Sequence, residues 1–181
     1  MNIDRSHRAA GFSMIEVLIA IVIVAVGLLG VAKMQAAAVS NTQVSRVQSL
    51  MALQASSLAA AMHANRSFWA AGAAPASWSA TGAVINDSTG VLSQAGANCA
   101  GGNTCTPPVL AAYDVQTWVA AMNTQFPTYN ANVTCTTSLS APISCSIQLS
   151  WQEKTVAINR GTTTSAAQQI TTQQYTLLVE P

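Results

Sequence analysis

Side chains capable of chemistry are sparse in this sequence, and the clearest of them is a carboxylate inside an apolar run. In GFSMIEVLIAIVIVAVGLLG, residues 11–30, Glu16 stands among side chains that otherwise suit the core of a bilayer. An ionisable residue in such a place is costly, so its presence points to a function. The chemistry that Glu16 offers is electrostatic: it can pair with a positive charge.

The other titratable residues do not form a recognisable catalytic set. His7 precedes the apolar run and His63 stands alone further along the chain. The sequence has no G-x-S-x-G, no metal-ligand cluster and no phosphate-binding loop, and its carboxylates are not spaced as an acid/base pair. We therefore expect no catalytic residue, no metal and no cofactor, and a membrane-anchored periplasmic enzyme is the disfavoured alternative. The carboxylates beyond Glu16 are Asp87, Asp114, Glu153 and Glu180; Asn86, Asp87 and Ser88 are interpreted as a solvated turn rather than a cation site.

Four cysteines form the second group of reactive side chains, and all of them follow the apolar run. An even number of cysteines in an exported segment is typical of disulfides formed in an oxidising compartment. Three pairings are possible, and we favour the local one because each pair then closes a short loop. A zinc site is the alternative, although structural zinc prefers pairs that lie closer together. The favoured pairs are Cys99–Cys105 and Cys135–Cys145.

The apolar run itself predicts a membrane-spanning helix. From Met14 to Ala32 it contains no charge except Glu16, and as a helix it is about 28 Å long, close to the hydrocarbon thickness of a bilayer. Basic residues precede the run, so the N-terminus is expected in the cytoplasm. A secretory signal cleaved near KMQAAA is the alternative.

Charge is scarce in the rest of the chain. Charged residues make up 7% of the sequence and the formal net charge is +1. Without a basic stripe, nucleic acid is not expected as a partner.

The helical pattern continues beyond the membrane exit. No proline or glycine occurs from Lys33 to Asn65, so one helix is predicted from about Ser13 to Asn65. Its second half is amphipathic and needs a surface to pack on. The residues expected on its buried face are Val44, Val47, Leu50, Met51, Leu53, Leu58 and Met62.

The C-terminal part predicts an α+β domain. Residues 67–108 are interpreted as a loop because glycine, serine and asparagine interrupt any period. A second helix is predicted to start with Asp114 as its N-cap and to end at Pro127. Alternating residues then predict three antiparallel strands, in ANVTCTT, ISCSIQLSW and QYTLLVE, joined in part by a polar connection over residues 161–169. The predicted fold is a long helix on a small antiparallel sheet.

The N-terminal residues resemble the signature of type IV pilins and pseudopilins. The shared features are a short basic leader, Gly11, the aromatic Phe12, and an apolar helix with Glu16 four residues after that aromatic. The resemblance implies that a prepilin peptidase cleaves between Gly11 and Phe12 and methylates the new amine. Glu16 would then pair with the amine of a neighbouring subunit, and helices in the wrong register would bury unpaired charges. Gly27 and Gly30 would permit close helix packing.

Further stretches resemble the PilV-type minor pilins. These are GLLGVAKMQAAAVSNTQ with LAAAMHANR, then YDVQTWVAAM and SIQLSWQE. The resemblance implies a minor pilin that helps to prime pilus assembly at the fibre tip and supports adhesion and twitching motility. Its implied partners are the prepilin peptidase, other minor pilins, the major pilin and a tip adhesin. A minor pseudopilin of a type II secretion system is the alternative, and a major pilin is disfavoured because residues 146–181 follow the last cysteine.

These inferences divide the chain into four segments. Residues 1–11 are the leader, 12–33 the transmembrane and assembly helix, 34–66 its amphipathic continuation, and 67–181 the globular domain. The protein is expected as a single-pass inner-membrane protein before assembly, and in the periplasm and the surface pilus afterwards. The resemblance assigns no role to residues 67–108.

Overall fold

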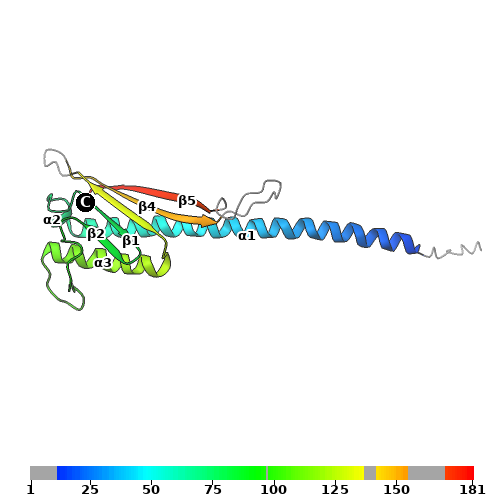
Figure 1. Ribbon diagram of the computed structural model, residues 1–181, viewed down its shortest axis with the longest axis horizontal. Coiled ribbons are helices and arrows are strands. Elements are labelled where there is room, and N and C mark those ends of the chain that lie inside the picture. The colour runs from blue at the N-terminus through cyan, green and yellow to red at the C-terminus, as the bar shows by residue number, and fades with distance from the viewer. Residues whose placement is uncertain (1–11, 97, 137–141, 155–169) are drawn as a thin grey trace, which may run out of the picture. The chain divides into compact units, whose positions relative to one another are not determined.

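The computed structural model describes residues 12–96, 98–136, 142–154 and 170–181. The chain divides into one unit that ends at Thr42 and a second unit from Gln43 to Pro181. The leader, Gly11 and the predicted connection over residues 161–169 lie outside the described residues. The elements are α1 (Met14–Ala64), α2 (Arg66–Trp69), β1 (Ser77–Thr81), β2 (Val84–Asp87), α3 (Pro107–Gln125), β3 (Asn130–Cys135), β4 (Cys145–Lys154) and β5 (Ile170–Val179) (Figure 1).

Helix α1 confirms the long helix predicted from the sequence. It starts at Met14 and ends at Ala64, as the absence of proline and glycine after Gly30 indicates. Within the second unit its buried residues are Met51, Ala55, Leu58, Ala59 and Met62, while Val44, Val47 and Leu50 are half-buried. The prediction was wrong for Leu53, which is 65% exposed.

Helix α3 begins earlier than the sequence pattern indicated. Its N-cap is Thr106, and proline follows in its first turn at Pro107 and Pro108, where a missing N–H costs nothing. Asp114 lies inside the helix, so its assignment as N-cap was wrong. The apolar face of the helix packs into the core, since Val115, Trp118, Val119 and Met122 are buried and Phe126 is half-buried.

Hydrogen bonds join α3 to the second half of α1. The indole Nε1 of Trp118 donates to the carbonyl oxygen of Gln54 over 2.9 Å. Directly after the end of α1, the side-chain amide of Asn65 donates to the carbonyl oxygen of Pro107, in the first turn of α3, over 2.7 Å. Both bonds are partly buried, and the lower local dielectric strengthens them relative to exposed bonds. Buried residues of both helices, among them Leu58 and Trp118, belong to the same hydrophobic core.

The sheet has five antiparallel strands in the order β2-β1-β3-β4-β5, whereas three were predicted. The alternation in β4 is confirmed: Cys145, Ile147, Leu149 and Trp151 are buried, and the residues between them face outward. Together with the helices, these residues form one hydrophobic core. The architecture is thus α+β, with a helix packed on a small antiparallel sheet, as predicted.

The interpretation of residues 67–108 as a loop was wrong in part. This stretch contains most of α2 and the whole hairpin β1–β2, whose strands pair from Trp78 with Asp87 to Thr81 with Val84. Gly82 occupies the first position of the two-residue turn with a φ of 56°, a conformation that favours glycine. Trp69 and Trp78 are buried and anchor the stretch to the core.

Tyr129 secures the β1–β2 turn. Its hydroxyl donates to the carbonyl oxygen of Gly82 over 3.0 Å, and burial raises the pKa of Tyr129 to about 12. Because this value exceeds that of an unfolded tyrosine, which is 10.0, the stabilisation is complete below pH 10 and is lost as the pH rises toward 12.

Replacing Tyr129 with phenylalanine should therefore change the alkaline behaviour of the protein. Near neutral pH we expect a loss of about 1 kcal/mol in the free energy of unfolding, because the Gly82 carbonyl loses its donor. Above pH 10 the variant should lose stability less steeply than the wild type. Denaturant titrations across this range provide the measurement, and parallel curves for the two proteins would contradict the assignment.

Candidate functional site

The candidate site lies on the first unit, in the first turns of α1. Glu16 is the acidic residue of the first helical turn, and its backbone N–H donates to the carbonyl oxygen of Ser13 over 3.0 Å. Unpaired N–H groups at a helix N-terminus favour a negative charge. The helix thus tolerates the Glu16 carboxylate in this position before any partner arrives.

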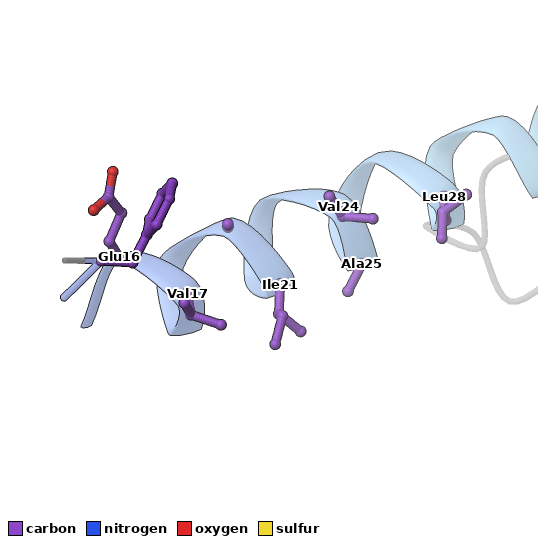
Figure 2. A pocket seen from close by; sticks show the side chains of 8 residues that line it. Glu16, Val17, Ile21, Val24, Ala25 and Leu28 are labelled. Carbon is purple, nitrogen blue, oxygen red and sulfur yellow. The ribbon is translucent and has the colours of Figure 1, made fainter. Parts of the chain in front are cut away.

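A shallow groove of about 530 Å³ runs along one side of this helix, with Phe12 and Glu16 at its N-terminal end. Figure 2 shows the Glu16 carboxylate at one end of a row of apolar side chains. The groove therefore combines a single acidic group with a surface suited to another apolar helix. Its lining residues are Phe12, Glu16, Val17, Ala20, Ile21, Val24, Ala25 and Leu28.

The sequence reasoning missed the small residues of this groove. Ala20 follows Glu16 by one helical turn, and the spacing continues with Val24 and Leu28, so the four share one side of the helix. This four-residue spacing is the sequence signal from which the groove could have been predicted. Gly27 and Gly30, which the sequence singled out, do not line it.

Nothing within the described chain requires glycine at positions 27 and 30. A Cβ placed on Gly27 or Gly30 would meet no other atom within 4 Å, and neither residue has a positive φ. Neither steric crowding nor backbone conformation inside the subunit therefore demands glycine. A need for small residues would have to come from a surface that contacts this helix.

The apolar side chains of the first unit are exposed along the described part of the helix. Phe12 is 83% exposed, Met14 88% and Leu29 66%, values far above those of a protein core. Helix α1 is long and apolar enough to cross a membrane, with a mean hydropathy of 2.9 over its most apolar window. Such a surface needs lipid or other apolar helices to cover it.

The second unit contains other carboxylates, and two of them accept hydrogen bonds from nearby residues. Burial alone would raise the pKa of Asp87, but hydrogen bonds from the N–H groups of Leu92 and Thr89 and from the Thr89 hydroxyl outweigh it and hold the pKa below its ordinary value. Burial raises the pKa of Asp114. Glu153 is buried and accepts a hydrogen bond from Trp151 Nε1 over 2.7 Å.

These carboxylates do not converge on a common centre. Within the described ranges, no three His, Cys, Asp or Glu side chains lie together as a metal site requires. The Asp87 carboxylate accepts hydrogen bonds from the turn that follows it. His63 is exposed in the last turn of α1.

Two disulfides lie in the second unit. Cys99 is bonded to Cys105 with an S–S distance of 2.02 Å, and Cys135 to Cys145 with 2.06 Å. Cys135 and Cys145 are also paired residues of β3 and β4, so this disulfide closes one end of the β3–β4 ladder. Thr136 and Ser144 continue the hairpin with a backbone hydrogen bond of 2.8 Å.

Comparison with known proteins gives one match. Residues 6–32 match the prokaryotic N-terminal methylation motif, a segment that includes Gly11, Phe12, Glu16 and the whole groove. No curated protein and no solved structure matches the chain. The features of the candidate site therefore all lie inside the matched segment.

Proposed function

A chain with the N-terminal methylation motif at residues 6–32 fits a type IV pilin or pseudopilin, and from this premise we propose that it is a minor pilin of the PilV type. In this role it is a structural subunit that helps to prime pilus assembly near the fibre tip, beneath or beside an adhesin, and so supports adhesion and twitching motility. The apolar α1 fits an anchor in the inner membrane before assembly, and the periplasm and the surface pilus are the proposed later locations.

The observation that carries the proposal is the groove with a carboxylate at its N-terminal end. Cleavage after Gly11 would make Phe12 the N-terminus, with a positively charged amine one helical turn before Glu16. When the apolar helices of neighbouring subunits bundle, Glu16 of one subunit can pair with the amine of the next. A wrong stagger would bury both charges unpaired, which is strongly unfavourable. The pair thus fixes the register of the bundle.

The second unit supports a minor rather than a major subunit. The Cys135–Cys145 disulfide joins β3 to β4 in the middle of the sheet, and all of β5 follows it. Major pilins usually carry a cysteine pair near the C-terminus, which this chain lacks. The resemblance of residues 8–66 to PilV-type subunits points the same way.

Processing provides the first test. Mass spectrometry of the chain purified from cell membranes should give a mature protein that begins with methylated Phe12. Replacing Gly11 with valine should abolish cleavage, because a β-branched side chain does not fit the peptidase subsite, and the full-length mass should then accumulate. A mature N-terminus that lies after the apolar run would overturn the proposal.

The proposed role as a minor subunit is tested by counting surface pili and the copies of the chain in each fibre. Deletion of the gene should strongly reduce the number of surface pili, and the chain should be present at only a few copies per fibre, because a subunit that starts a fibre is needed only where the fibre begins. Copy numbers that rise in proportion to fibre length would indicate a major subunit. Normal piliation combined with lost protein secretion would indicate the pseudopilin alternative.

A further inference from the structure

The two edges of the sheet are built differently. At one edge, β2 has four residues and ends at Asp87, whose carboxylate is engaged in the following turn. At the other edge, β5 has ten residues, and each is paired with a residue of β4 from Ile170 opposite Lys154 to Val179 opposite Cys145. Figure 1 shows β5 in red beside β4. Among the described residues, no strand lies on the other side of β5.

Within its own ten residues, strand β5 carries none of the sequence features that usually protect an edge strand. Natural proteins blunt edge strands with charges, prolines, bulges or short length, because the free N–H and C=O groups attract other strands. The sequence of β5, ITTQQYTLLV, contains no charge and no proline, and its register with β4 is unbroken. The other edge strand, β2, is protected by its short length of four residues, whereas β5 is long.

The core is also incompletely covered at β5. In β4 the core-facing residues Ile147 and Leu149 are fully buried, whereas their partners Leu177 and Tyr175 in β5 are only partly buried. On the opposite face, Leu178 is 76% exposed. A further strand beside β5 would cover apolar area on both faces of the sheet.

We propose that the free edge of β5 binds an extended segment of another protein by β-strand addition. Main-chain hydrogen bonds along the edge supply affinity, and side chains at alternate positions supply specificity. The bound segment is uncharged over the paired stretch, because a charge placed beside Tyr175 or Leu178 would lose water without gaining a counter-ion. It carries apolar residues opposite Leu177 and Leu178. None of these β5 residues lines the groove on α1.

A synthetic peptide with this pattern tests the proposal. The probe is a fluorescent peptide of alternating valine and threonine that matches the ten residues of β5 in length, with two lysines outside the paired stretch for solubility. It is titrated against the full-length chain in detergent micelles, with empty micelles as the blank. We expect saturable binding with a dissociation constant of about 1–100 μM. The absence of saturable binding up to about 1 mM would overturn the proposal.

Two matched substitutions locate the binding. Leu178→Lys places a protective charge on the edge of β5, and Val84→Lys places the same charge on β2, where Val84 is 61% exposed. Both side chains are exposed aliphatic groups on edge strands, so both variants should keep the melting temperature of the wild type. We expect Leu178→Lys to weaken binding at least about tenfold and Val84→Lys less than about twofold. Equal effects would overturn the assignment to β5.

Amide hydrogen exchange gives a readout that does not depend on any variant. In an antiparallel ladder, alternate N–H groups of β5 point toward β4 and the others toward the free edge. Binding of the peptide should protect the second set in the wild-type chain. Protection of β2, or self-association of the chain through β5 without the peptide, would contradict the proposed partner.

Discussion

Glu16→Ala is expected to leave processing intact and to reduce the amount of the chain in pili by at least about tenfold, since breaking a buried ion pair costs about 3–5 kcal/mol. The remaining amine of the neighbouring subunit would then be buried without a counter-charge. Most of the protein should stay in the membrane fraction, and surface fibres should become fewer. The ratio of pilus-associated to membrane-associated protein, measured by immunoblot of sheared cells, gives the result.

Conservative variants separate charge from shape in this experiment. Glu16→Gln keeps the size of the side chain but removes its charge, so it should behave like the alanine variant. Glu16→Asp keeps the charge and should restore part of the incorporation. Val26→Ala shortens an aliphatic side chain that does not line the groove and serves as a control. If the glutamine variant enters pili normally, the carboxylate does not set the register.

Removal of the Cys135–Cys145 disulfide is expected to cost the second unit about 2–3 kcal/mol, since the bond closes a loop with a sequence separation of 10. For a unit of this size, the melting temperature should fall by about 7–10 °C. The double variant Cys135→Ala with Cys145→Ala avoids leaving free thiols. Thermal unfolding of the full-length chain in detergent, followed by far-UV circular dichroism, measures the effect.

The second disulfide provides the matched control. Cys99 and Cys105 lie between the hairpin and α3, outside any helix or strand. The corresponding double alanine variant should lower the melting temperature by less than half as much, because that segment can loosen without opening the core. An unchanged melting temperature for the Cys135–Cys145 variant would show that the hairpin does not need its cross-link.

The sequence was most informative where one signal repeats over many residues. Helix α1 could be predicted almost to the residue because no proline or glycine interrupts it after Gly30. Strand β4 could be predicted because large apolar residues such as Ile147 and Leu149 alternate with serine and glutamine. In both cases the local pattern and the tertiary burial agree.

Prediction failed where the signals were short or weak. In the hairpin β1–β2, the buried face of β1 consists of Trp78 and Ala80, too few apolar residues to show a period of two. The start of α3 was misplaced because Asp114 is a favourable cap by type, while the proline at the first helical position after Thr106 was the better signal.

The candidate site could be predicted only in part, for a physical reason. Glu16 stands out by itself because a charge among apolar residues is costly whatever surrounds it. The groove residues Ala20 and Ala25 do not stand out, because small apolar residues are common in helices. Their role depends on the helix that packs against them, which a single sequence does not contain.

The attachment of α3 to α1 has a mechanical consequence. Within the second unit, a force that pulls α1 along its axis would act first on Val44 and Val47, which are half-buried. Further along, the force is shared by Met51, Leu58 and the bond from Trp118 to Gln54, which are loaded together in shear rather than opened one after another. These contacts would therefore resist extraction of the second half of α1 together rather than singly.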